Sequence, residues 1–309
     1  MRPTFINKLI AEAQTDSRIF LMVGDLGYNM IEPFREKFPK RFLNAGIAEQ
    51  NMMGVAAGMA MQGFIVYVYS IGNFNTLRCL EQIRNDVCYN NLNVRIVCMG
   101  EGYSYGSAGM SHHATEDIGV MRVLPGIVVA SPANNIETEK IISLSFIHTG
   151  PMYIRLGKTR KLNAENYNPE YLEKVSNMMI GEVLPVINNN KTNAILSTSS
   201  LVEDLKDQIE TSYNDYDLYS VPFLKPLSKI HLKAIAEKYD SLICLEEHQE
   251  NCGMSSAIIE IINDMYAKGE IRRYPIIYRR GIKDKFQHLG GSQSYLREKE
   301  GLGLPIMLD

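Results

Sequence analysis

Residues 42–62, FLNAGIAEQNMMGVAAGMAMQ, set the pattern from which the fold can be predicted. From residue 48 onward the segment is rich in Ala, Gly and Met, and it predicts a helix over 48–62. The apolar run FIVYVY follows directly and predicts a buried strand over 64–69. A helix that leads into a buried strand is the repeating unit of α/β proteins, in which helices connect parallel strands.

The same alternation continues on both sides of this segment. It predicts an α/β fold with two doubly wound domains, each a mainly parallel sheet with helices on both faces and right-handed crossovers. The first half has strands predicted at 18–23, 64–69, 93–98, 127–130 and 152–156, and helices near 3–14, 48–62, 75–90 and 134–147. The second half has strands predicted at 193–198, 216–221, 241–245 and 274–278, and helices near 200–210, 228–238 and 253–267.

The length of the chain, 309 residues, also favours two domains. From about 158 to 179 the sequence loses its apolar periodicity and becomes charged and rich in Asn, which is typical of an interdomain linker. We therefore predict a first domain over 1–160, a linker over 161–180 and a second domain over 181–309.

Composition narrows the class of protein. A hydrophobic content of 45%, a charged content of 22% and a net charge of -3 give no sign of disorder, membrane insertion or a basic surface for nucleic acid. The N-terminal MRPTFINKLIAEAQTD fits an amphipathic helix better than a signal peptide, so we expect a cytoplasmic protein. The five cysteines are an odd number without a CxxC pair, which argues against a disulfide framework and a zinc site.

Glu49, the one carboxylate of the 42–62 segment, allows two interpretations. A glutamate in a first helical turn is favoured by the helix dipole and needs no further function. However, the small residues Gly54, Ala57 and Gly58 allow another element to approach the helix closely, which an exposed helix would not need. The apolar flanks also predict burial of the carboxyl, which would keep a proton available near neutral pH.

The sequence GIAEQNMMGVAAGMA resembles the catalytic-glutamate helix of the transketolase and deoxyxylulose-phosphate synthase families. This resemblance implies that thiamine diphosphate is the cofactor and that Glu49 hydrogen-bonds a ring nitrogen of its aminopyrimidine. In those families this contact promotes the imino tautomer, which deprotonates the thiazolium carbon, while the protein supplies orientation and proton control. Residues 1–160 then correspond to the pyrimidine-binding domain and 181–309 to the transketolase C-terminal domain.

Two further segments resemble cofactor contacts of the family. Asp25 and Leu26 end the first strand, where family members carry an Asp-Leu pair near the thiazolium; an ordinary polar turn is the alternative. YSIGNFNTLRCLEQIRNDV resembles the segment whose phenylalanines stack on the pyrimidine and whose helix forms a dimer contact. This chain has Gly72 and Asn75 at the usual aromatic positions, so Phe74 is the remaining candidate, although a core phenylalanine would look the same.

The glycine-rich segment MGEGYSYGSAGMSHHATEDIGVMRVLPGI resembles the substrate loop of the family. Its glycines permit close backbone approach to a ligand, and a flexible surface loop is the alternative. His112 aligns with the family histidine that contacts the reacting sugar or the cofactor-bound intermediate, so it is implied as a catalytic and substrate-binding residue. His113 is a second candidate substrate contact. Adjacent histidines make a poor metal site, and we expect no metal ligand in this chain.

The departures from the family concern the substrate. Ala108 stands where transketolases carry the loop aspartate, and Gly100 and Glu101 stand where related enzymes place a phosphate-binding His or Arg. A carboxylate at that position would repel a phosphate. Lys158 aligns with a family arginine that binds the sugar phosphate, and it would act as a point charge without the bidentate fork. The substrate therefore need not be the usual pentose or hexose phosphate.

In the second half, ICLEEHQENCGMSSAIIEII and GIKDKFQHLGGSQSYLREKEGL resemble the C-terminal domain of the family. The resemblance thus covers nearly the whole chain from the first strand onward. The family role of this domain is structural and supports dimerisation, so we expect no catalysis by His248.

One family feature is missing from the sequence. Family enzymes hold the cofactor diphosphate through a magnesium ion, using a GDG motif and a downstream Asn, and this chain contains no GDG. We therefore expect a second polypeptide, an N-terminal transketolase subunit, to bind the diphosphate with Mg2+ or Ca2+. The expected assembly is an α2β2 heterotetramer, and a large part of the apolar helix surface, including 48–62 and 75–90, is expected to be buried only on assembly.

The resulting functional hypothesis is a subunit of a split transketolase that transfers a two-carbon unit from a ketose or 2-oxo acid to an aldehyde. Two alternatives remain open: the beta subunit of a 2-oxo acid dehydrogenase decarboxylase component, and a non-catalytic regulatory homologue. GIAEQ, the paired histidines and the EEH turn favour the transketolase branch. Glu49 and His112 argue against a silent homologue, whereas Ala108 and the altered aromatic segment leave it open.

Overall fold

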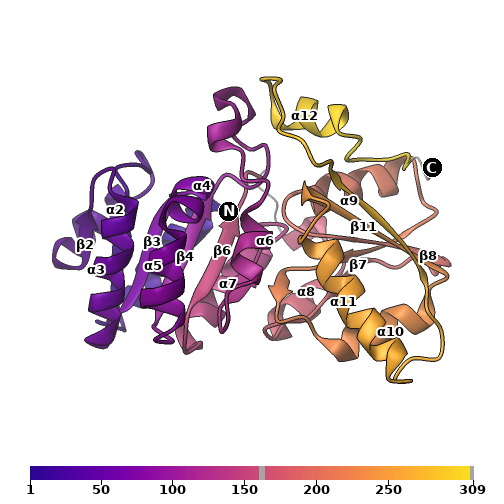
Figure 1. The fold of residues 1–309 in the computed structure, drawn as a ribbon, viewed down its shortest axis with the longest axis horizontal. Helices are drawn as coiled ribbons and strands as arrows, with labels where there is room; N and C mark the ends of the chain where they lie inside the picture. Colours follow the sequence, from indigo (N-terminus) through magenta and orange to yellow (C-terminus); the bar gives the residue numbers. More distant parts are fainter. Residues whose placement is uncertain (160–163, 307–309) are drawn as a thin grey trace.

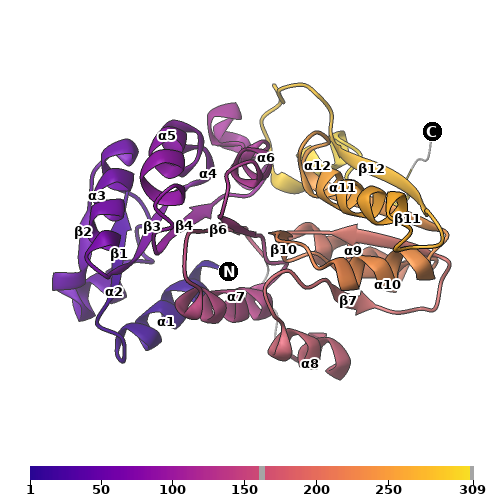
Figure 2. The ribbon, with the colours of Figure 1, turned by 60° about the horizontal axis from the view of Figure 1, so that its bottom comes forward.

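The structure is a computed structural model that describes residues 1–159 and 164–306. It contains a seven-stranded and a five-stranded sheet, which lie side by side (Figures 1 and 2). The fold class predicted from the sequence is confirmed, and every predicted strand is present with small shifts at its ends. In the described part of the chain, no helix is long and apolar enough to cross a membrane.

The first sheet has the strand order β10-β5-β6-β4-β3-β1-β2, and all neighbours are parallel except the pair β10 and β5. Successive side chains of a strand point to opposite faces of its sheet, so both faces need a cover of helices. In the central strand β3, Tyr67 and Tyr69 pack on one face, and Val66 and Val68 pack on the other. The strands are β1 (Ile19–Val23), β2 (Phe42–Asn44), β3 (Ile65–Ile71), β4 (Val94–Met99), β5 (Val128–Ala130), β6 (Met152–Leu156) and β10 (Phe223–Lys225).

Helices cover both faces of this sheet, as Figure 2 shows. α1 (Arg2–Ala13) and α7 (Asn135–Ile147) pack on one face through residues such as Phe5, Leu9 and Ile141. α3 (Glu49–Met61) packs on the other face through Met52 and Ala56, so these apolar side chains are already buried in the single chain and not only on assembly. The short helices α2 (Glu32–Lys37) and α6 (Asp117–Arg122) and the 3-10 turns η1 (Pro39–Arg41), η4 (Gly106–Ala108) and η5 (Met110–His112) complete this half.

The second sheet has the order β12-β11-β8-β9-β7, with β7 antiparallel to β9. One face packs on α9 (Leu201–Thr211), and the other packs on α10 (Lys229–Lys238) and α11 (Met254–Ala267). A last helix, α12 (Gln293–Lys299), lies over the junction of the two sheets (Figure 1). The strands are β7 (Leu184–Ile187), β8 (Asn193–Ser197), β9 (Asp217–Ser220), β11 (Ser241–Gln249) and β12 (Ile276–Ile282).

The helix predicted near 75–90 is present only in part, since residues 80–88 are helical without interruption and the chain breaks before them. Near residue 76 polar side chains bond to backbone carbonyls and compete with the helical pattern. Thr76 Oγ1 donates to Gly72 O at 2.7 Å, and Asn75 Nδ2 donates to Val68 O at 2.9 Å. The helical pieces of this segment are α4 (Gly72–Asn75), the 3-10 turn η2 (Leu77–Cys79), α5 (Leu80–Gln82) and the π-helical turn η3 (Ile83–Cys88).

The segment predicted as a linker over 161–180 contains a packed helix. Residues 161–163 lie outside the described residues, and η6 (Ala164–Asn166) and α8 (Pro169–Asn177) follow. Asn168 caps α8 by accepting from the Tyr171 N–H at 2.7 Å, and the Tyr171 side chain is buried against α7. Strand β10, which was not predicted, belongs to the second half of the chain but completes the first sheet. The two sheets are therefore tied together by more than one connection, and the domain division stays a prediction.

Candidate active site

The candidate site lies at one edge of the first sheet. Asp25 and Leu26 follow β1, Phe74 follows β3, the loop 100–113 follows β4, and Lys158 follows β6. These strands are parallel neighbours in the order β6-β4-β3-β1, so their carboxyl ends meet at the same edge. Ligands of open α/β sheets bind at this edge. The topology therefore brings together residues that are far apart in the sequence.

Glu49 is the first residue of α3 and lies beside this edge. Its side chain is buried, with 2% of the residue exposed. A Cβ atom added to Gly24, which directly follows β1, would lie 3.7 Å from Glu49 Oε1 and 3.4 Å from Ser70 Oγ. Glycine at position 24 therefore leaves room next to the carboxylate, at the ends of β1 and β3.

Arg78 is a site residue that the sequence did not reveal. Its Nη1 donates to Glu49 Oε2 at 2.8 Å, and its guanidinium lies 4.4 Å from the centre of the Phe74 ring. Arg78 is half-exposed, whereas Glu49 is buried. The one signal available was the four-residue spacing from Phe74 to Arg78, which on a helix makes two side chains neighbours.

The ring of Phe74 contacts both Arg78 and the substrate loop. The rings of Phe74 and His112 lie edge to face, with their centres 5.2 Å apart. His112 Nδ1 is 3.0 Å from Ser111 Oγ, and its ring centre is 6.1 Å from that of Tyr105. Two of the predicted residues, Phe74 and His112, are thus direct neighbours, and Arg78 shares the ring of Phe74.

Lys158 reaches the same loop from the end of β6. Its Nζ donates to Ser104 O at 2.9 Å and lies 4.5 Å from the centre of the Tyr105 ring. Tyr105 therefore lies between Lys158 and His112. Partial burial and the nearby Arg2 lower the pKa of the Lys158 ammonium.

His113 differs from its neighbour in its surroundings. It is buried, its Nε2 is 3.3 Å from Gly106 O, and its ring lies edge to face with Tyr103 at 5.0 Å. It also lines a cavity of about 350 Å³ together with Met110 and Phe286. His113 thus packs inside the loop, whereas His112 is only partly buried.

Asp25 and Leu26 form the turn after β1. Asp25 has a φ of +52° and is held by Asn44, whose Oδ1 accepts from the Asp25 N–H at 3.1 Å and whose Nδ2 donates to Asp25 Oδ1 at 2.9 Å. Leu26 is partly buried and packs against the core. The Asp25 carboxylate is therefore fixed by Asn44, a contact that the sequence did not indicate.

Glu101 contacts the second half of the chain. Its carboxylate accepts hydrogen bonds from the N–H of Ser200, at 2.9 Å, and from the Ser200 hydroxyl. Burial raises the pKa of Glu101, which is 1% exposed. Gly157 leaves the space that this carboxylate fills. Repulsion of a substrate phosphate by Glu101 stays a prediction, and the contact with Ser200 shows the direction of the carboxylate, which sequence position alone does not give.

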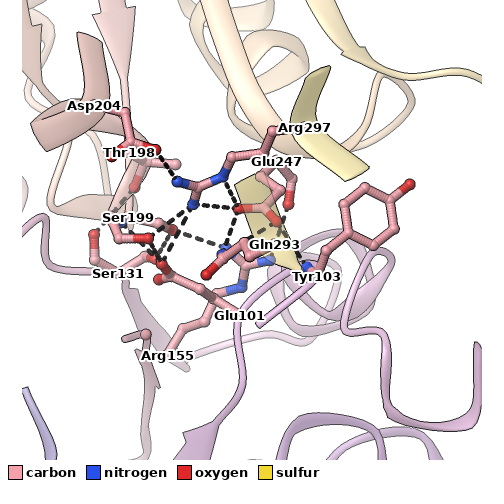
Figure 3. Close-up of polar contacts among 12 residues, drawn as sticks. Glu101, Tyr103, Ser131, Arg155, Thr198, Ser199, Asp204, Glu247, Gln293 and Arg297 are labelled. Carbon is pink, nitrogen blue, oxygen red and sulfur yellow. Dashed lines mark hydrogen bonds and ion pairs between the residues drawn. The ribbon is translucent and has the colours of Figure 1, made fainter. Parts of the chain in front are cut away.

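The EEH segment, predicted as a turn, lies inside strand β11, and its three side chains make separate contacts. Glu246 accepts from the N–H groups of Met254 and Ser255 at 2.6 and 2.8 Å and so caps α11. His248 is buried, and its Nε2 accepts from the Gly119 N–H at 3.2 Å. Glu247 contacts the loop 100–113 at the Tyr103 N–H (Figure 3). These contacts agree with a structural role for His248.

The site suits an aminopyrimidine at Glu49. In residues 1–159 and 164–306, Glu49 Oε1 receives no hydrogen bond, and the buried Ser70 Oγ has no partner. A carboxylate oxygen without a hydrogen bond can bind a ring nitrogen of a ligand, and the Ser70 hydroxyl, which lies near the same glycine, can bind a further polar group. Among the described residues, no group of three or more His, Cys, Asp or Glu side chains could hold a metal ion.

Comparison with known proteins finds one family for both halves of the chain. Residues 1–161 match the family described as "Transketolase, pyrimidine binding domain", and residues 184–284 match "Transketolase, C-terminal domain". An apulose-4-phosphate transketolase subunit of Actinobacillus succinogenes is 31% identical over 90% of this chain and 86% of its own. The 6-deoxy-6-sulfo-D-fructose transketolase subunit of Clostridium sp. is 28% identical over 98% and 90%.

A solved structure is similar over almost the whole chain. It is described as "Split gene transketolase, inactive beta4 tetramer" and is 28% identical, with a TM-score of 0.80. The similarity covers 97% of this chain and 93% of the other.

Proposed function

We propose that this chain, which belongs to the transketolase family, is the pyrimidine-binding subunit of a split thiamine-diphosphate enzyme. The enzyme transfers a two-carbon unit from a ketose or 2-oxo acid to an aldehyde. The observation that carries the proposal is Glu49, a buried carboxylate at the carboxyl ends of parallel strands with one oxygen that receives no hydrogen bond from the described residues. When bound, thiamine diphosphate supplies the nucleophilic carbon and the electron sink.

Glu49 has the role of holding a proton at the ring nitrogen of the aminopyrimidine. Its Oε1 is the atom open to that contact, because Oε2 is paired with Arg78. Arg78 also covers the Phe74 ring, so stacking of the pyrimidine on that face requires the guanidinium to move. Arg78 therefore contacts Glu49 and also limits access to Phe74. Asp25 and Leu26 are proposed to contact the cofactor from the turn after β1.

His112 and Lys158 are proposed to contact the substrate. If Ser111 donates to His112 Nδ1, the neutral imidazole carries its proton on Nε2 and can donate to a substrate oxygen. Lys158 supplies a positive charge across Tyr105 from His112. His113 is retained as a candidate contact only through the cavity that it lines.

We infer a sugar substrate with a terminal anionic group. The Glu101 carboxylate binds Ser200, whereas the Lys158 ammonium donates to the Ser104 carbonyl. The two relatives described above are named for a sugar phosphate and a sulfosugar, which both carry such a group. Lys158 can pair with either anion as a point charge.

A partner subunit is proposed to hold the diphosphate through Mg2+. The relatives named as transketolase subunits and the split-gene structure support a chain that works in an assembly, which we take to be α2β2. Ile47 and Leu77, two large apolar side chains near the site, are exposed in the single chain, and we expect the partner to cover them. The cytoplasmic location stays a prediction from the sequence.

The test is reconstitution. We expect the isolated chain to bind thiamine diphosphate weakly and to have no activity, and we expect the partner to restore both. The assembled pair would then be screened with sugar phosphates, sulfosugars and unphosphorylated sugars. Full activity of the isolated chain would contradict the split-enzyme proposal. Decarboxylation of a 2-oxo acid without transfer to an aldehyde would instead support the decarboxylase alternative.

The role of Glu49 has its own measurement. Glu49→Ala in the assembled pair should abolish proton exchange at the thiazolium carbon while the far-ultraviolet circular dichroism stays unchanged. An unchanged exchange rate would remove Glu49 from the mechanism.

A further inference from the structure

The loop 100–113, which carries His112, is attached to the second half of the chain. The Tyr103 N–H donates to Glu247 Oε1 at 2.7 Å, across 144 positions of sequence. Two loop glycines make this attachment possible. A Cβ atom on Gly102 would overlap the Glu247 carboxylate, and a Cβ on Gly106 would lie 2.6 Å from both Gly291 O and Leu296 Cδ1. These glycines therefore allow the loop to approach the second half of the chain closely. From the sequence we had expected them to allow close approach to a ligand.

Glu247 is itself held by the C-terminal helix α12. Arg297 donates to Glu247 Oε2 from Nε at 2.8 Å and from Nη2 at 2.5 Å, and Gln293 Nε2 donates to the same oxygen at 2.9 Å. Glu247 and Arg297 are both buried. A buried carboxylate with this many charged and neutral donors has a fixed position.

Arg297 connects this carboxylate to the rest of the junction. Figure 3 shows its guanidinium between Asp204 and Glu247, and Nη1 donates to Asp204 Oδ2 at 2.5 Å. Its Nη2 also donates to Ser200 Oγ at 2.8 Å, and Ser200 in turn binds Glu101 at the start of the loop. The loop is thus anchored at Glu101 and at Tyr103, and both anchors meet at Arg297.

The anchor at Tyr103 leads to the paired histidines. The Tyr103 ring packs against His113, the His113 ring lies 3.3 Å from Gly106 O, and His112 is the next residue along the chain. A shift of Tyr103 would therefore move the imidazole that is proposed to face the substrate. Misplacement of a reacting group by about 1 Å can cost up to roughly a hundredfold in rate.

We infer that Glu247, fixed by Arg297, is a positioning residue for His112, so that the second half of the chain sets the geometry of the substrate loop. This inference rests on the proposed function, in which His112 contacts the substrate. Glu247 itself touches neither substrate nor cofactor in this assignment.

The main variant is Glu247→Gln. An amide has one acceptor oxygen, whereas Tyr103 donates to Oε1 and Arg297 donates to Oε2. Either orientation of the glutamine places its NH2 group against a donor, so one contact is lost. The matched control is Glu246→Gln, the same change at the neighbouring buried carboxylate, which caps α11 and does not touch the loop.

The first measurement uses the isolated full chain and needs no cofactor or substrate. Hydrogen–deuterium exchange followed by mass spectrometry should show exchange of the peptide over 100–113 at least about tenfold faster in Glu247→Gln, and unchanged exchange there in Glu246→Gln. Gln293→Ala, which removes one donor to Glu247, should give a smaller increase and serves if Glu247→Gln does not fold. Unchanged loop exchange in both loop-side variants would overturn the inference.

The second measurement uses the chain assembled with its partner. Glu247→Gln should lower kcat/KM roughly tenfold with unchanged affinity for thiamine diphosphate, and it should have no further effect in a His112→Asn background. An equal loss in both backgrounds would show a general structural effect and would overturn the inference. Full activity of His112→Asn would contradict the proposed function, and the exchange experiment would then still decide whether Glu247 holds the loop.

Discussion

Glu137 is expected to make the stability of this protein fall as pH rises. It lies in the first turn of α7, fully buried, where Oε2 accepts from the Ala133 N–H at 2.7 Å and Oε1 accepts from the Tyr171 hydroxyl at 2.7 Å. Burial raises the pKa of this carboxyl from 4.5 to about 7, although these hydrogen bonds oppose the shift. The neighbouring Glu203 adds to the increase.

The sign and size of the effect follow from linkage. Because folding raises the pKa of Glu137, the folded chain binds this proton more tightly than the unfolded chain does. The stabilising contribution is complete below about pH 4.5 and is lost as the pH rises through about 7. A shift from 4.5 to about 7, at 1.36 kcal/mol for each pKa unit, corresponds to about 3 kcal/mol.

The assay compares the chain with its Glu137→Gln variant in urea unfolding at a series of pH values between 4.5 and 8.5. The glutamine cannot ionise, so the difference in unfolding free energy between the two proteins should change by about 3 kcal/mol over this range, to the disadvantage of Glu137 at high pH. Glu139→Gln, an exposed change on the same helix, is the control and should leave the pH dependence unaltered. Parallel curves for the chain and Glu137→Gln would refute the reasoning.

Three further outcomes are expected. Arg78→Gln should lower the unfolding free energy by about 1–2 kcal/mol, less than for a fully buried pair because Arg78 is half-exposed. The loss should be smaller in a Glu49→Gln background, where only the contact with the Phe74 ring remains; equal losses in both backgrounds would show that Arg78 and Glu49 do not interact. Lys158→Met should raise KM roughly tenfold for a sugar phosphate and leave KM for the unphosphorylated sugar unchanged. An equal rise in KM for both substrates would show that Lys158 does not bind the anionic group. A thiol reagent at pH 8 should modify Cys252 rapidly and the four buried cysteines slowly, and rapid modification of the Cys252→Ser variant would contradict this burial.

The two sheets could be predicted because their strands are continuous apolar runs, which can be recognised without knowing their distant contacts. Local contacts were harder to predict. The helix expected over 75–90 is broken because Asn75 and Thr76 bond to carbonyls of β3 and α4, which no periodicity reveals. α8 was missed although Asn168 followed by Pro169 is a helix-start signal, since the charged surroundings outweighed it.

Site residues could be predicted where a single residue stands out in the sequence. Contacts between residues far apart in the sequence could not be predicted. Glu49 stood out as a single carboxylate in an apolar helix, and the structure buries it. The contacts of Glu101 with Ser200 and of Tyr103 with Glu247 span 99 and 144 positions, so the direction of the loop side chains could not be predicted. Arg78 was missed because its contact with Glu49 depends on the irregular path of the chain near residues 75–79.

Strand β10 has a consequence for how this protein could be divided by truncation or recombination. β10 pairs with β5 through Phe223 and Ala130, so the edge strand of the first sheet comes from beyond position 220. A fragment that stops near residue 180 would leave the amide and carbonyl groups of β5 bare, and an open sheet margin attracts other chains and promotes aggregation. We therefore expect the two halves of this chain to fold well only when they are kept together in one chain.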